Sequence, residues 1–262
     1  MFAGVMAAVP LAVFYVYAIT YIPTVKLNAL LTILLGAIIG YAVGWQAIRS
    51  EIRSRVFPAA IGLFCGLVAV YVAWGIDPIA RFGEPQDGHL LSFFSPSFMW
   101  QYIQVFYANG FWAVGKGAPV NGIGLAVFWA LEALCILGFA AWTPWNEFDH
   151  QVYCEKCGRW ATSKKDALQV CVDSEDRLRT ELENGDIALL CTSPRPNPGP
   201  GKFVKVGLDW CDECGETSCL DAWSVEVKLD KKGNATTTET QFIRKLLISR
   251  EATIRLFELG ES

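Results

Sequence analysis

Four apolar segments, each near the length that crosses a lipid bilayer, constrain the fold of this chain most strongly. A helix needs ~20 residues to cross a ~30 Å hydrocarbon layer, and such segments lie at residues 2–22, 27–48, 57–74 and 123–142. They predict a membrane-embedded, four-helix transmembrane domain over residues 1–143. The first segment has neither a basic leader nor a convincing cleavage site, so we expect a retained anchor and not a removable signal peptide.

Charged residues divide the chain near Pro144. Residues 1–143 contain six Lys/Arg and five Asp/Glu, whereas residues 144–262 contain 16 and 21 and therefore carry a formal net charge of −5. Nucleic-acid binding requires a basic face, so this balance argues against a nucleic-acid partner. We expect residues 144–262 to form a second, water-exposed domain.

Basic residues in the loops predict the orientation. Three arginines lie between residues 49 and 55, whereas the link after the first segment offers only Lys26 and the link at residues 76–120 offers two basic residues. By the positive-inside rule, the arginine-rich loop is cytoplasmic. We therefore expect a multi-pass protein, of the bacterial inner-membrane kind, with both termini in the cytoplasm and the lipid bilayer as its first partner.

Glycines at four-residue spacing mark one face of the second segment and one face of the third. The five positions are Gly36, Gly40, Gly44, Gly62 and Gly66. A smooth glycine face lets helix backbones approach closely, which is a main source of helix association in lipid. This glycine-zipper pattern predicts tight packing of the two helices as an antiparallel pair. The alternative is that one glycine face remains available for homo-oligomerisation.

The link between the third and fourth segments is rich in aromatic residues and contains signals for a short helix. Ser95-Pro96 is a good helix start and Asn109-Gly110 a good stop, which predicts a helix over residues 95–109. Because it is too short to span, we expect it to lie in the outer interface of the membrane. A re-entrant segment, or a lipid-binding or gating role, is the alternative. His89, in the same link, is expected to be a solvated loop residue.

Glu132 is the acidic residue that lies well inside an apolar segment. An ionised carboxylate at that depth costs roughly 2.5–3.5 kcal/mol, so we expect Glu132 to be protonated, paired or directed into the bundle. It is interpreted either as a neutral carboxyl bonded to a neighbouring helix or as a proton or cation site. The other apolar segments supply no second ionisable residue, which argues against a transport relay.

Two Cys-x-x-Cys-Gly motifs lie in the second domain, at Cys154/Cys157 and at Cys211/Cys214. The tight turn of such a motif aims two thiolates at one ion, so two motifs supply four ligands. In the reducing cytoplasm, paired motifs of this kind are typical of metal sites and not of disulfides. Three other thiols have no partner at ligand spacing and are expected to be buried free cysteines: Cys171, Cys191 and Cys219. Cys219 is close enough to Cys214 in the sequence to be a possible substitute ligand.

The two motifs resemble those of zinc ribbons and rubredoxins over residues 153–160 and 210–216. The resemblance implies a small domain in which the four motif cysteines bind one tetrahedral ion. The 53 residues between the motifs exceed the ~15–20 of compact ribbons, which predicts an insertion over residues 158–210 with its own helix and strand. Zinc is the favoured ion because it suits a closed sulfur site that stabilises a small fold. Iron, the alternative, would make a one-electron carrier.

Local patterns in the second domain predict a small α+β fold. A helix capped by Asp173 or Ser174 should end at Asn184-Gly185, and residues 187–191 are interpreted as a strand. Further strands are expected at residues 202–210, 218–229 and 236–248, with a turn at 231–234. Ser249 is the expected cap of a closing helix.

The residues of this chain favour a non-enzymatic role. The sequence shows no nucleophilic triad, phosphate loop, carboxylate pair or open metal site. His150 is best interpreted as a solvated or capping residue. The leading hypothesis is a polytopic membrane protein that presents a zinc-stabilised, acidic cytoplasmic domain as a docking or assembly module for a protein partner or a second copy. The alternatives are a membrane-tethered electron carrier and a small channel or transporter that uses Glu132.

Overall fold

The computed structural model describes residues 2–22, 25–83, 90–110, 112–113, 119–149, 151–197, 199–229 and 235–261. The chain separates into two compact units, Met1–His150 and Gln151–Ser262, which are treated in turn. His89, His150 and the turn expected at 231–234 lie outside the described residues.

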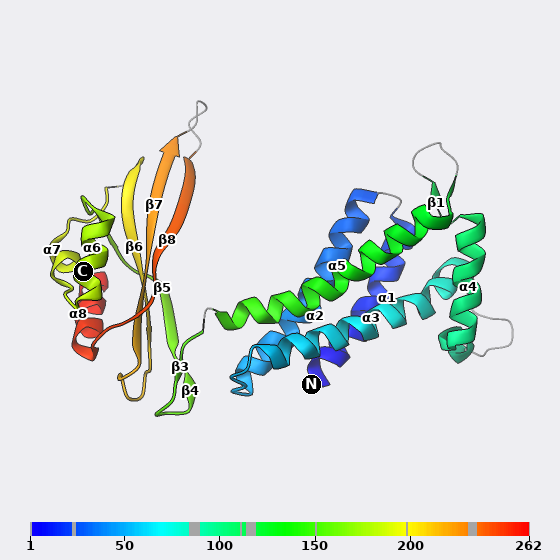
Figure 1. Cartoon of the computed structure of the whole chain (residues 1–262), viewed down its shortest axis with the longest axis horizontal. Helices are drawn as coiled ribbons and strands as arrows, with labels where there is room; N and C mark the ends of the chain where they lie inside the picture. The colour runs from blue at the N-terminus through cyan, green and yellow to red at the C-terminus, as the bar shows by residue number, and fades with distance from the viewer. Residues whose placement is uncertain are drawn as a thin grey trace. The chain divides into compact units, whose positions relative to one another are not determined.

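The first unit is a bundle of long helices with a shorter helix at one end (Figure 1). Among the described residues, four helices are long and apolar enough to cross a membrane, by length and composition. The long helices are α1 (Phe2–Tyr21), α2 (Val25–Arg49), α3 (Val56–Phe82) and α5 (Gly122–Asp149). The shorter elements between α3 and α5 are η1 (Leu90–Phe94), α4 (Pro96–Asn109), β1 (Trp112–Ala113) and β2 (Pro119–Val120).

Helix α5 continues through Pro144 to Asp149, so the units divide at residue 150 and not at the expected 143. Pro144 has no N–H and leaves the carbonyl of Ala140 without its usual donor four residues later. Glycines of two neighbouring helices lie against this carbonyl: a Cβ at Gly40 would be 2.9 Å from the Ala140 oxygen, and one at Gly62 would collide with it. Such close approach permits Cα–H···O contacts, and neighbouring helices commonly allow proline inside a membrane helix.

The glycine faces of α2 and α3 both lie against α5 and not against each other. A Cβ at Gly36 would be 2.6 Å from the Ile136 carbonyl oxygen, and one at Gly66 would be 3.2 Å from the Cβ of Ala140. The antiparallel pairing expected from the sequence is therefore replaced by packing of both faces on a third helix. In the described residues, α5 already occupies the glycine face that a second copy would need.

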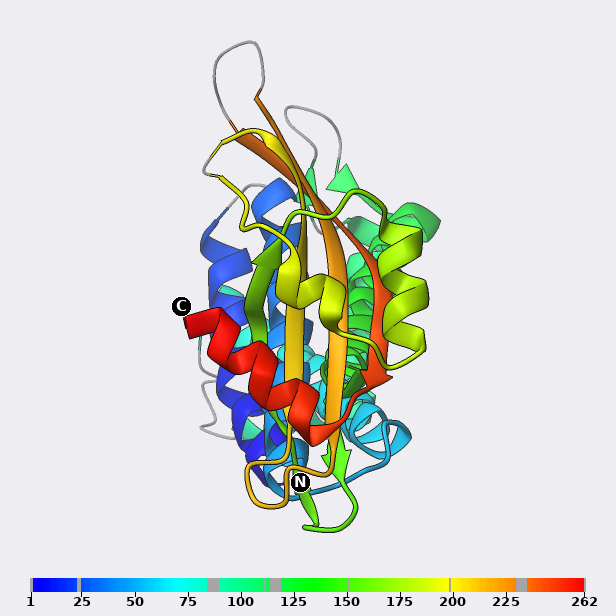
Figure 2. The same ribbon diagram turned by 90° about the vertical axis from the view of Figure 1, so that its left-hand side faces the viewer.

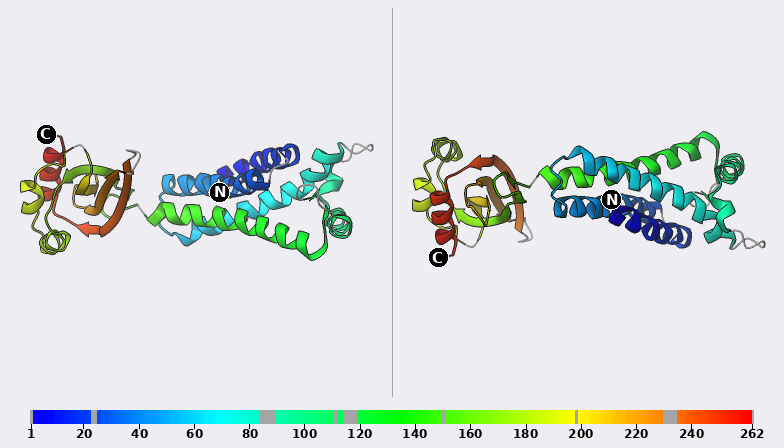
Figure 3. Two further views of the ribbon diagram at one scale, coloured as in Figure 1. Left: turned by 90° about the horizontal axis from the view of Figure 1, so that it is seen from above. Right: turned by 90° about the horizontal axis from the view of Figure 1, so that it is seen from below.

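Helix α4 lies across one end of the bundle (Figures 1 and 3). It begins where the sequence predicts, because the Ser95 hydroxyl accepts a hydrogen bond from the Phe98 N–H at 3.2 Å. It ends at Asn109 and is followed by Gly110, whose φ of 89° lies in the left-handed region that favours glycine. The opposite end of the bundle carries the arginine-rich loop between α2 and α3. We refer to these as the α4 end and the arginine end.

The second unit is a four-stranded antiparallel sheet with the strand order β5-β6-β7-β8. Helices α6, α7 and α8 cover one face of this sheet (Figure 2). Their apolar residues meet those of the strands in one core, in which Leu178, Leu208 and Leu256 are fully buried. The elements are β3 (Tyr153–Cys154), β4 (Arg159–Trp160), β5 (Thr162–Val170), α6 (Glu175–Glu183), α7 (Ala188–Thr192), β6 (Gly201–Trp210), β7 (Ser218–Leu229), β8 (Ala235–Leu247) and α8 (Arg250–Glu261).

Residues 158–210, expected to be an insertion, supply β5 and β6 and therefore half of the main sheet. The predicted strand at 187–191 is wrong, since this segment forms the short helix α7. The Asp186 carboxylate accepts from the Ala188 N–H at 2.8 Å, and this local bond favours a helical turn. The helix capped by Ser174 and the strands near 202–210, 218–229 and 236–248 are present as predicted.

Candidate metal centre

The first cysteine motif forms the turn of a two-stranded hairpin. Strands β3 and β4 pair so that Tyr153 lies opposite Trp160, and the two rings meet edge to face with centroids 5.1 Å apart. The Gly158 N–H donates to the Cys154 carbonyl at 2.9 Å. Gly158 has a φ of 68°, which explains why glycine follows the second cysteine.

The second motif connects β6 to β7. The last pair of this ladder joins Trp210 to Ser218, so both ends of the connection are held by the sheet. Gly215 repeats the geometry of the first motif, with a φ of 63° and an N–H that donates to the Cys211 carbonyl at 2.9 Å. The Cys211 N–H donates to the Thr217 carbonyl at 2.9 Å. The two motifs therefore present their thiols in similar turns.

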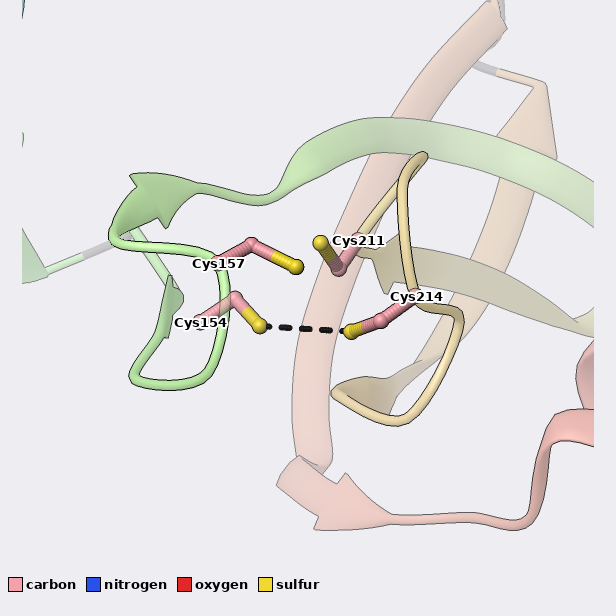
Figure 4. A group of neighbouring side chains, drawn as sticks. All are labelled: Cys154, Cys157, Cys211 and Cys214. Atoms are coloured by element: carbon pink, nitrogen blue, oxygen red, sulfur yellow. Dashed lines mark hydrogen bonds between the residues drawn. The ribbon is translucent and has the colours of Figure 1, made fainter.

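The four motif sulfurs converge on one point (Figure 4). All four lie within 4.8 Å of one another, and the sulfurs of Cys154 and Cys214 are 3.5 Å apart. A tetrahedral site with metal–sulfur bonds of about 2.3 Å requires sulfurs roughly 3.8 Å apart. The arrangement therefore fits a single tetrahedral ion with little movement.

Hydrogen bonds around the sulfurs favour a negatively charged site. The Thr217 hydroxyl and the Cys157 N–H donate to Cys154 and lower the pKa of its thiol to about 6. The contact with Cys214 raises the pKa of the Cys157 thiol. The sulfurs of Cys154 and Cys214 are in direct contact, and a cation that binds between thiols takes the place of their protons.

Side chains beside the cysteines join the two motifs directly. Arg159 forms an ion pair with Glu213 at 2.7 Å, and Lys156 forms another with Glu216. These side chains are about half exposed, so each pair contributes little to stability. In both pairs the basic residue belongs to the first motif and the acidic residue to the second, so the pairs favour contact between the two turns.

Sequence reasoning identified all four clustered cysteines, and the structure leaves the other three thiols of this unit outside the cluster. Cys219, the possible substitute ligand, is a 4% exposed residue of β7, and burial raises the pKa of its thiol. It is therefore a buried free cysteine. Thr217 was missed, because no spacing rule links a hydroxyl after the second motif to a sulfur of the first.

A buried charged network beside the sheet was also missed. The ammonium group of Lys245 lies 2.7 Å from a carboxylate oxygen of Asp209 and 2.9 Å from one of Asp221. The aspartates are 2% and 5% exposed. Lys245 has a φ of 48° at an irregularity of β8, and its N–H also donates to Asp221 at 2.8 Å. The three residues lie on different strands, so only the folded sheet brings them together.

In the first unit, Glu132 is not the sole acidic group among the long helices. Helix α3 extends beyond residue 74 to Phe82 and includes Asp77, which lines the same cavity as Glu132. This corrects the expectation that no second ionisable residue would line the other helices. Asp77 and Arg81 have the four-residue spacing of a helical ion pair, a signal that the apolar pattern alone obscured.

No protein-family model, curated protein or solved structure matches this chain in comparisons with known proteins. Functional inference therefore depends on the residues of the two units.

Proposed function

We propose that the protein is a multi-pass membrane protein whose second unit is a zinc-stabilised docking module on the cytoplasmic side. The observation that carries this proposal is the convergence of four thiols from two separate turns on one point. All four ligand positions of a tetrahedral ion are then filled by protein, which is typical of structural and not catalytic zinc. When bound, such an ion supplies folding free energy to the domain.

Zinc is the ion that the surroundings favour. The four ligands are all sulfur, and the motifs are rigid turns closed by glycines, so the site offers tetrahedral geometry without an open position. Iron would fit the same sulfur geometry and is an outcome of the test below.

The docking role is supported by the open edge of the sheet. Strand β8 is last in the strand order, and residues 235–241 of this strand are all exposed. An exposed edge offers backbone donors and acceptors to an added strand, which is a common mode of peptide recognition. The acidic balance of residues 144–262 favours a partner with a basic segment. Self-assembly through the same edge is the other form of this proposal.

Metal analysis of the purified full-length protein tests the centre. We expect one zinc per chain, a colourless sample, and loss of the metal in Cys154→Ser and Cys211→Ser. Cys171→Ser and Cys191→Ser are matched controls from the same unit and should retain it. An intensely coloured sample with one iron would replace zinc by a redox centre, and full metal retention in Cys211→Ser would disprove the site.

Cross-linking mass spectrometry in native membranes tests docking. We expect cross-links from Lys228 or Lys205, near the exposed part of the sheet, to one recurrent partner or to a second copy. Thr238→Pro is the matched perturbation, because proline removes a backbone donor from the strand, and it should abolish those cross-links. Cross-links that survive this substitution, or that never involve the second unit, would contradict the docking role.

A further inference from the structure

A small cavity lies among α1, α3 and α5, with a volume of about 60 Å³. Its lining includes Tyr15, Trp74, Asp77, Trp129 and Glu132. The two tryptophan rings meet edge to face with centroids 5.1 Å apart. The cavity has room for water but is well below the ~150 Å³ of a cavity that accepts benzene, so it is too small for an organic substrate.

Asp77 already has its partners. The Arg81 Nε lies 3.0 and 2.9 Å from the two oxygens of its carboxylate, and the Tyr102 hydroxyl of α4 donates to it at 2.6 Å. The side chain of Arg81 is 25% exposed. The charge of Asp77 is therefore balanced by Arg81, and this pair connects the cavity to the α4 end of the bundle.

Glu132 has a different environment. Its carboxyl group contacts the Tyr15 hydroxyl of α1, and in the described part of the chain it forms no ion pair with a lysine or arginine. The other charged group that lines the cavity is Asp77, whose charge is already balanced by Arg81. An ionised Glu132 would therefore be a carboxylate without a cation at membrane depth, which is costly.

A count of hydrogens distinguishes the two charge states of Glu132. The Tyr15 hydroxyl contacts both Glu132 and, at 2.9 Å, the Thr32 hydroxyl of α2, which in turn donates to the Asn28 carbonyl at 2.9 Å. These three contacts require three hydrogens, but the two hydroxyls supply only one each. If Glu132 is ionised, Tyr15 donates to it and one contact lacks a hydrogen. If Glu132 is protonated, every contact is satisfied in the order Glu132, Tyr15, Thr32, Asn28.

We propose that Glu132 is a proton-binding site that exchanges with the α4 end of the bundle through this cavity. The bound proton is the third hydrogen in the series of hydrogen bonds that links α5, α1 and α2. Toward the arginine end, α5 is closed by the glycine faces of α2 and α3, so the exchange is with one side only. Loss of the proton reverses the Tyr15 bond, removes one of the three links and leaves an uncompensated charge, so the packing of α1 responds to acidity at the α4 end.

Infrared spectroscopy of the full-length protein in lipid nanodiscs tests the bound proton, because a protonated carboxyl group has its own carbonyl stretching band. We expect such a band at neutral pH, its loss in Glu132→Gln, and its persistence in Glu51→Gln, a control at an exposed carboxyl group of the same unit. A spectrum without the band at neutral pH, or one that Glu132→Gln leaves unchanged, would overturn the proposal.

Tyr15→Phe provides a second measurement that keeps the carboxyl group and the aromatic ring. The Glu132 band should move to higher frequency, because the hydrogen-bond partner of its carboxyl group is removed. A band that does not move would refute the hydrogen bond between Glu132 and Tyr15. In vesicles of uniform orientation, the band should respond to a pH change on the α4 side. A response from the arginine side instead would refute exchange with the α4 end.

Discussion

Replacement of Gly62 by alanine is the sharpest test of the packing of the four-helix bundle. The added methyl would collide with the Ala140 carbonyl oxygen, and a backbone atom cannot turn aside as a side chain can. The carbon would also be 3.3 Å from Cγ of Pro144. Helix α3 must therefore move away from α5, and overpacking of this kind costs about 1–3 kcal/mol.

Alanine also favours a helix over glycine by roughly 0.8–1.0 kcal/mol, which would conceal part of this cost. Gly138→Ala on α5 is the matched control, because nothing lies within 4 Å of its Cβ position. Both variants receive the same helical gain, so the difference between them isolates the collision. We expect Gly62→Ala to be less stable than Gly138→Ala by about 1–3 kcal/mol in reversible unfolding of the full-length protein in detergent. Equal stabilities would refute the packing of α3 on α5 described above.

Three further predictions concern the second unit. Lys245→Met should destabilise the full chain in denaturant titrations by about 3–5 kcal/mol, because it leaves Asp209 and Asp221 buried without their cation; a loss below 1 kcal/mol would contradict the network. Burial lowers the pKa of Lys245, but the hydrogen bonds and charges of the two aspartates outweigh it and raise the pKa overall. The stabilisation by Lys245 is therefore complete below a pH of about 10.4 and is lost as the pH rises through the folded pKa. The difference in stability between wild type and Lys245→Met should shrink when the denaturant titrations are repeated at strongly alkaline pH. A difference that grows with pH would contradict this sign. Ser174→Ala should cost about 1 kcal/mol in the same titrations through loss of the α6 cap, whereas Ser163→Ala, at an exposed position of β5, should cost less.

The local signals in the sequence were sufficient where one short pattern determines one element. Ser95 and Ser174 cap the helices that they predict, and the strands before and after the second motif lie where alternation places them. The four clustered cysteines are of this kind too, because each motif carries its own turn. Length and composition likewise identify the four long helices.

The remaining features depend on contacts between distant residues. The glycines of α2 and α3 predicted close packing but did not identify the helix that they pack on. That helix is α5, where Pro144 leaves the Ala140 carbonyl open to the approach of a glycine face. Asp77 falls in the link that was expected at residues 76–120, although the helix continues through Pro78 to Phe82. The bond between Tyr102 and Asp77 joins α4 to α3 across 25 residues, and no local pattern reports it.

The separation of the two cysteine motifs determines when the cluster of four cysteines can form. Cys157 and Cys211 are 54 positions apart in the sequence, and at about 5–20 residues per second a ribosome needs roughly 3–11 s to pass from one to the other. Throughout that interval, the first motif is a dithiol without its partner turn, while all four long helices have already been synthesised. The two thiols of the first motif therefore spend several seconds without the other two, and the four-cysteine cluster can close only after the second motif has been synthesised.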